Sequence, residues 1–152
     1  MKYIDLESLK LNELVALLNE CEVRTHLIQH DLYDEKSAQD WINSKLEINS
    51  LKGCYVRAIE IEGKLVGWCG IQPDDFGHEI AIVLQKNSWG VGATVFKDLM
   101  AKAQKMGLKE VALNLLNSRP KYVSLSRLAS RVETRNVHGG CFTTYYISVP
   151  DA

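Results

Sequence analysis

An apolar segment of the chain passes into an amphipathic one through Leu84-Gln85-Lys86-Asn87-Ser88-Trp89-Gly90-Val91-Gly92-Ala93-Thr94. Residues 79–84, on its amino-terminal side, predict a strand. After the turn, apolar residues recur at helical spacing as far as Gly107, and they are Val95, Leu99, Ala103 and Met106. Glycines let a ligand approach the backbone, and the first N–H groups of a helix have no intrahelical partner. The sequence therefore predicts that residues 89–93 bind an anion such as phosphate.

Periodicity on either side of this turn predicts further strands. Three are expected to form an antiparallel meander at residues 54–61, 65–71 and 78–84. The helix after Gly92 then leads to a strand at 109–116 through a right-handed parallel crossover. A further helix is expected to start at Pro120, and its apolar face comprises Leu125, Leu128, Ala129 and Val132. The last expected strand, at 141–149, follows Gly139-Gly140.

Two helices are predicted to precede the meander. Asn12 is the expected N-cap of the first and Asp34 of the second. Their apolar stripes comprise Leu14, Leu17 and Leu18 in the first, and Ala38, Trp41, Ile42 and Leu46 in the second. The resulting order is two helices, three strands, helix, strand, helix, strand. With 152 residues, we expect one α/β (α+β) domain over residues 1–152 that has a mixed sheet and its own core.

Composition narrows the class of protein. The chain is 46% hydrophobic and 24% charged, and it has no apolar run near the roughly 20 residues that span a bilayer. We therefore expect a cytoplasmic protein with no membrane partner. The cysteines, at positions 21, 54, 69 and 141, lack metal-ligand spacing. They are predicted to be reduced core residues rather than a disulfide pair or a zinc site, and no metal is expected.

Charge is distributed unevenly along the chain. Residues 1–79 carry fifteen Asp and Glu against eight Lys and Arg, whereas residues 80–152 carry four acids against ten bases. A basic carboxy-terminal half suits a phosphate-bearing ligand, and an acidic amino-terminal half suits a cationic one. The basic set near the end, which comprises Arg119, Lys121, Arg127, Arg131 and Arg135, either binds phosphate or forms a solvated face. A nucleic acid is not the expected partner, because no regular interleaving of aromatic and basic residues is present.

The glycine turn resembles the signature of the GNAT superfamily of acetyl-coenzyme A dependent N-acetyltransferases, which is a strand, a Q/R-x-x-G-x-G/A turn and a long helix. The order Trp89-Gly90-x-Gly92-Ala93-Thr94 is most similar to the form in ribosomal-protein N-terminal acetyltransferases. Asn87 stands where the wider signature has Gln or Arg. The resemblance covers about residues 54–149, and it implies a single GNAT-like domain whose mostly antiparallel sheet has splayed central parallel strands.

The resemblance also implies that acetyl-coenzyme A is the co-substrate. Its pyrophosphate would lie on the turn, and its pantetheine arm in a V-shaped cleft between residues 82–84 and residues 115–117. The candidate coenzyme-binding residues are Ile82, Val83, Leu84, Asn87, Ser88, Trp89, Gly90, Val91, Gly92, Ala93, Asn117 and Arg127. The N–H of Leu84 is the candidate donor to the thioester oxyanion.

Glu79 is the candidate base that takes the proton from the amine. Alternation along 79–84 places Glu79, Ala81 and Val83 on one face of the strand and Ile80, Ile82 and Leu84 on the other. His78 is the competing base, on the opposite face. Members of this family often carry a Tyr or Ser that acts as general acid on the helix after the strand expected at 109–116. Tyr122 and Ser126 are the candidates here.

The acceptor is expected to be an amine on a protein N-terminus, a lysine or a small molecule. Arg24, His26, His30 and Tyr33 are candidate contacts to it, because the equivalent connection borders the acceptor site in the family that the chain resembles. An apolar last strand at 145–149 would allow pairing across a homodimer. Two rival interpretations remain: a non-catalytic module that binds acyl-coenzyme A, and a dinucleotide-binding domain. The second lacks a third glycine, because Val95 stands at that position.

Overall fold

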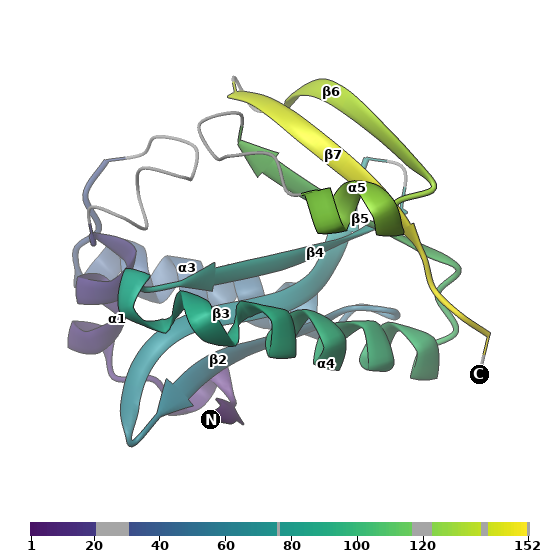
Figure 1. Cartoon of the computed structure of the whole chain (residues 1–152). Helices are drawn as coiled ribbons and strands as arrows, with labels where there is room; N and C mark the ends of the chain where they lie inside the picture. Colours follow the sequence, from purple (N-terminus) through teal and green to yellow (C-terminus); the bar gives the residue numbers. More distant parts are fainter. Residues whose placement is uncertain (21–30, 76, 117–122, 138–139, 152) are drawn as a thin grey trace.

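In the computed structural model of this chain, residues 1–20, 31–75, 77–116, 123–137 and 140–151 are described. They form a seven-stranded sheet with helices on both faces (Figure 1). The strand order is β1-β2-β3-β4-β5-β7-β6, and β4 and β5 are the parallel pair. The strands are β1 (Lys2–Ile4), β2 (Tyr55–Ile61), β3 (Lys64–Asp74), β4 (Gly77–Leu84), β5 (Glu110–Leu116), β6 (Arg131–Val137) and β7 (Gly140–Ser148).

The helices divide between the two faces of the sheet. They are α1 (Leu11–Leu18), α3 (Glu35–Asn49), α4 (Gly92–Lys105) and α5 (Val123–Leu128), with short 3₁₀ helices at Leu6–Ser8 and Lys86–Val91. One core contains Leu14, Leu17, Ala38 and Ile42 of α1 and α3. The core on the opposite face contains Val95, Leu99 and Ala103 of α4. Since both faces of the sheet are covered, β3 is almost continuously buried from Leu65 to Gln72.

Local sequence explains where α3 and α4 begin and end. Asp34 caps α3 as predicted, because its side chain accepts the Ser37 N–H at 2.8 Å while the Ser37 hydroxyl accepts the Asp34 N–H at 2.9 Å. The apolar stripe of α4 is buried, and the chain turns after it at Gly107, whose φ is +77°. These two predicted helices are confirmed.

Two predictions about local structure are wrong, and one strand was not predicted. Lys10 is the N-cap of α1, and Asn12 lies inside that helix. The helix expected through Val132 ends at Leu128, because residues 131–137 form edge strand β6 against β7. In this segment Val132 and Thr134 alternate with charged residues, a strand pattern that competes with the helical one. Strand β1 was not predicted, because its three residues are too few to show a period.

The carboxy-terminal strand differs from expectation in two further ways. β7 lies between β5 and β6, so it has no free edge for the pairing across a homodimer that its apolar sequence suggested. The homodimer itself stays a prediction. Cys54 and Cys69 are buried free thiols as predicted, but Cys141 on β7 is exposed.

Gly67 lets β4 stay close to β3 as far as the last residue of β4. A Cβ atom at this position would lie 2.1 Å from the carbonyl oxygen of Val83, which no side chain can tolerate. Gly67 is the register partner of Leu84, the last residue of β4. The close approach of β4 to β3 therefore continues as far as Leu84.

Candidate active site

β4 and β5 pair at their amino-terminal ends and then diverge, as the two arrowheads in Figure 1 show. In the described parts of these strands, the register contains one pair, Glu79 opposite Ala112. A cavity of about 1480 Å³ opens beyond it. Its lining includes Ala81 and Val83, which face α1 and α3, and Ile82 and Leu84, which face α4. The predicted alternation along β4 is therefore confirmed, and the cavity passes through the sheet.

Backbone groups of β4 point into this gap. The N–H of Gln85 donates to the carbonyl of Val66 at 2.8 Å, which makes this a hydrogen-bonded pair of the β3–β4 ladder. Antiparallel pairs alternate, so the N–H and C=O groups of Ile82 and Leu84 turn away from β3 toward the gap. The Leu84 carbonyl accepts the indole N–H of Trp89 at 3.0 Å. The indole of Trp89 therefore pairs with the carbonyl of Leu84, the residue whose N–H is the candidate oxyanion donor.

The glycine turn forms a 3₁₀ helix before α4 begins at Gly92. The N–H of Gly92 donates to the carbonyl of Trp89, and the N-cap residue Val91 offers no side-chain cap to the N–H groups that follow. Around Gly92 the space is open, because a Cβ atom there would meet Leu84 Cδ1 at 3.8 Å. The amino-terminal, positive end of α4 therefore lies at the cavity. Three of the predicted turn residues line it, namely Trp89, Gly92 and Ala93, whereas Asn87, Ser88, Gly90 and Val91 lie outside the lining.

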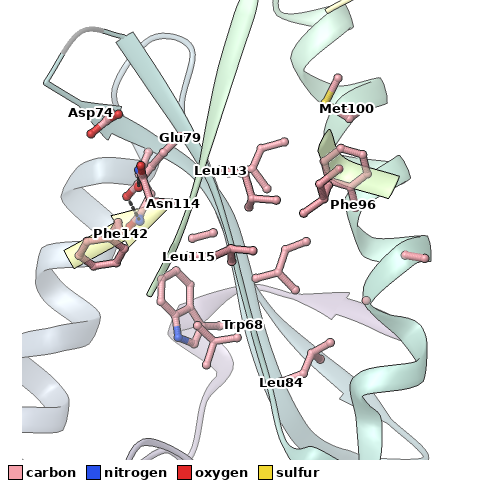
Figure 2. A pocket seen from close by; sticks show the side chains of 18 of the residues that line it. Trp68, Asp74, Glu79, Leu84, Phe96, Met100, Leu113, Asn114, Leu115 and Phe142 are labelled. Atoms are coloured by element: carbon pink, nitrogen blue, oxygen red, sulfur yellow. Dashed lines mark hydrogen bonds between the residues drawn. The ribbon is translucent and has the colours of Figure 1, made fainter. Parts of the chain in front are cut away.

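On the α3 side of the cavity, two amide side chains hold the carboxylate of Glu79. Figure 2 shows one of them, Asn114, beside Glu79. Asn114 of β5 donates from Nδ2 to Oε2 at 2.8 Å, and Gln72 of β3 donates from Nε2 to Oε1 at 3.3 Å. Two further donors fix how these amides are turned. The hydroxyl of Thr144 on β7 donates to Asn114 Oδ1 at 2.6 Å, and Lys45 Nζ of α3 donates to Gln72 Oε1 at 2.5 Å. Both NH₂ groups must therefore face Glu79.

The electrostatics of this cluster favour a basic carboxylate. Burial raises the pKa of Glu79 above its ordinary value, and the charge of Asp74 adds to that rise. The hydrogen bonds from Asn114 and Gln72 and the charge of Lys45 oppose it. A carboxylate with a raised pKa is a better proton acceptor than an exposed one. The structure thus places the predicted base in a suitable environment at the point where β4 and β5 separate.

Thr144→Val is expected to raise the pKa of Glu79 further. The variant keeps the shape of the side chain but removes the hydroxyl that fixes Asn114, so the amide of Asn114 can turn its oxygen toward the carboxylate. A hydrogen bond to a charged group is worth about 1.5–3 kcal/mol, which corresponds to a rise of about one pKa unit or more. A carboxyl-carbon NMR titration would measure it, with Thr134→Val on exposed β6 as the control. An unchanged pKa of Glu79 in Thr144→Val would contradict this role for Thr144.

An acidic pair lines the cavity near Glu79. Asp74 and Asp75, at the end of β3, each accept a hydrogen bond from Arg135 of β6 at 3.1 Å. Arg135 and Asp74 are largely buried, with side chains 11% exposed, whereas the Asp75 side chain is 63% exposed. This contact joins the β6–β7 hairpin to the β3–β4 turn. Arg135, a member of the basic set found in the sequence, is therefore part of a structural ion pair.

The remaining predicted residues lie in different places. Tyr33 lines the cavity, whereas His78 lies outside its lining, next to Gly53. Ser126 and Arg127 are exposed on α5 and are also outside the lining, which Ser124 and Leu125 of that helix reach. Seven candidates lie outside the described residues: Arg24, His26, His30, Asn117, Arg119, Lys121 and Tyr122.

Sequence reasoning missed the side chains that surround Glu79, and a signal existed for one of them. Lys45 continues the apolar stripe of α3, where Ala38, Trp41 and Ile42 precede it at i, i+3 and i+4 and Lys45 follows at i+7. A lysine in an apolar stripe is a candidate for a buried charge. Asn114 and Thr144 are polar residues within apolar strands, but their contacts depend on long-range strand pairing.

Across the described parts of the chain, no group of His, Cys, Asp and Glu is arranged to hold a metal ion. No described helix is long and apolar enough to cross a membrane. What the structure offers is one cavity that joins a helix amino terminus to a buried carboxylate through two splayed strands.

Comparison with known proteins agrees with this geometry. The profile of the acetyltransferase (GNAT) family matches residues 11–123. The chain therefore belongs to the acetyltransferase (GNAT) family. No curated protein matches it significantly.

Solved structures show the same fold at low sequence identity. An N-acetyltransferase from Staphylococcus aureus is 12% identical with a TM-score of 0.71, and the match covers 98% of this chain and 97% of that one. A ribosomal-protein-alanine N-acetyltransferase from Brucella melitensis is 17% identical with a TM-score of 0.64, over 95% of both chains. The PaiA N-acetyltransferase from Thermoplasma acidophilum, solved with coenzyme A, is 15% identical with a TM-score of 0.59, over 97% of this chain and 99% of that one.

Proposed function

We propose that this protein transfers an acetyl group from acetyl-coenzyme A to a primary amine by direct attack. The observation that carries the proposal is the cavity through the sheet, which connects the amino terminus of α4 with Glu79. Membership of the acetyltransferase (GNAT) family supports the reaction class. The structural neighbour that contains coenzyme A supports the identity of the carrier.

The carrier would enter on the α4 side of the sheet. The uncapped N–H groups at the start of α4 would receive its pyrophosphate, and the open space at Gly92 permits this approach. The exposed N–H groups of Ile82 and Leu84 on the splayed edge of β4 would pair with the pantetheine amides, as a neighbouring strand would. This places the thioester near the point of the V, and a β4 N–H would donate to its oxygen as negative charge develops there.

The amine would approach from the α3 side. A primary amine must be neutral to attack, and a lysine-type ammonium with a pKa near 10.4 is almost wholly protonated at pH 7. Glu79 would accept a proton from it, directly or through water. The amine nitrogen then forms a bond to the acetyl carbon, the carbon–sulfur bond breaks, and the coenzyme leaves as a thiolate. A thiol has a pKa near 8.5, so this leaving group is acceptable without a strong acid.

The purified protein tests the proposal directly. Titration calorimetry should detect acetyl-coenzyme A binding, and a thiol-detecting reagent should report release of free coenzyme A when a suitable amine is added. Binding without thiol release across peptide N-termini, lysine, amino acids and polyamines would instead favour the non-catalytic acyl-coenzyme A-binding module. Absence of binding would contradict both functions.

A further inference from the structure

Lys45 places a positive charge at the cavity, and no carboxylate of the described residues lies within 4.0 Å of it. Its Nζ lies 4.5 Å from the ring centroid of Trp68 and 5.6 Å from that of Trp41, two indoles that also line the cavity. Of the three N–H donors on this ammonium, one has a hydrogen-bond acceptor among the described residues, Gln72 Oε1. None of the ion pairs found within 4.0 Å among the described residues involves Lys45.

A cation in such a place is costly unless an anion accompanies it. Burial lowers the pKa of Lys45 to about 8, although the charge of Glu79 opposes this change. Stacking against indole rings compensates part of the lost hydration. The other two N–H donors of Lys45 have no hydrogen-bond acceptor among the described residues. An anionic group on a ligand would satisfy them and would favour the charged form of Lys45.

The distance between Lys45 and Glu79 limits what that ligand can be. Both groups bind the same primary amide, because Lys45 Nζ bonds to Gln72 Oε1 at 2.5 Å and Gln72 Nε2 bonds to Glu79 Oε1 at 3.3 Å. The O and N atoms of an amide are about 2.3 Å apart, so Nζ and Oε1 of Glu79 lie within about 8 Å of each other. An α-amino acid has its nitrogen about 3 Å from its carboxylate oxygens. With one hydrogen bond of about 2.8 Å at each end, it can reach across any separation up to this limit.

We propose that the acceptor is a free α-amino acid, whose carboxylate binds Lys45 Nζ while its amine faces Glu79. This inference rests on the proposed acetyltransferase function and specifies its substrate class. Asp74 and Asp75 repel the carboxylate of the amino acid only weakly, because both are paired with Arg135. The walls nearest Lys45 are Trp41 and Trp68, which suit an apolar side chain. Polyamines and aminoglycosides, which carry no carboxylate, would leave the Lys45 donors unsatisfied.

Matched acceptors test the proposal by thiol release from acetyl-coenzyme A. L-Amino acids such as L-phenylalanine and L-leucine are compared with their amides and with the decarboxylated amines. We expect kcat/KM for the best amino acid to exceed that of both its analogues at least tenfold, since hydrogen bonds to charged groups carry this much discrimination. The amide is the stricter comparison, because its amine has the lower pKa and would react faster if Lys45 played no part.

Variants of Lys45 then assign the preference to this side chain. Lys45→Met should reduce the preference for the carboxylate to one or below, Lys45→Arg should retain it in part, and Lys36→Met on the exposed first turn of α3 should leave it unchanged. Thermal unfolding of each variant separates loss of specificity from loss of fold. A preference that survives in Lys45→Met, or a wild-type enzyme that acetylates the neutral analogues equally well, overturns the inference but leaves the acetyltransferase function standing. Absence of thiol release with every amine overturns the proposed function itself.

Discussion

Glu79→Gln is expected to lower kcat/KM for the amine acceptor by about a hundredfold at neutral pH, the lower end of what a general base contributes. Glutamine fills the same space but cannot accept a proton. In the wild type, the pKa of Glu79 is raised by burial, so activity should rise with pH as this carboxyl loses its proton. Glu79→Gln has no carboxyl group to titrate at this position, so its activity should lack this rise with pH. It should lose less rate at alkaline pH, where more of the amine is already neutral.

A pH series of thiol-release rates measures this effect. Glu47→Gln, on the exposed side of α3, is the matched control and should behave like the wild type. In Glu79→Gln, the new NH₂ group meets either Asn114 or Gln72, both of which already direct NH₂ groups at this position. Thermal unfolding should therefore accompany the kinetics. If the pH profile of the variant coincides with that of the wild type, Glu79 is not the base.

Gly92→Glu is expected to abolish binding of acetyl-coenzyme A. The new carboxylate would lie in the first turn of α4, where the pyrophosphate is proposed to bind, and it would repel that group. An acidic residue at a helix amino terminus stabilises the helix, so the variant should fold. Loss of binding would then report on the site rather than on stability.

Gly92→Ala provides the control for size. Its Cβ atom would meet Leu84 Cδ1 at 3.8 Å, an ordinary contact, so we expect binding close to that of the wild type. Calorimetry with acetyl-coenzyme A on the three proteins gives the comparison. Binding by Gly92→Glu with wild-type affinity would show that the carrier binds elsewhere.

Local sequence predicted the elements that carry strong periodicity or a distinctive turn. The segment from Gly77 to Lys105 reads correctly because an alternating strand, a glycine turn and a helical stripe follow one another without ambiguity. The strands at the two edges of the sheet could not be predicted in this way. β1 has only three residues, and β6 carries both a helical and an alternating pattern. Which pattern forms is decided by pairing with β7, a contact that no local window contains.

The site divides in the same way. Glu79 and the turn could be predicted because the turn carries a motif and Glu79 lies on the strand that leads into it. The amides that hold Glu79 come from β3 and β5, and the groups that fix them come from α3 and β7. Gln72 and Glu79 are seven positions apart, but the other side chains that meet there are 27 to 35 positions apart, so neither spacing nor periodicity reveals them.

Because the cavity crosses the sheet, the proposed sites for the carrier and for the amine are bordered by different helices. Phe96 and Met100 line it from α4, while Trp41 and Lys45 line it from α3. If the carrier and the amine bind as proposed, substitutions on α3 should change which amine fits without changing how the carrier binds. A mutant library confined to the inward positions of this one helix is the direct way to redirect the scaffold to new acceptors.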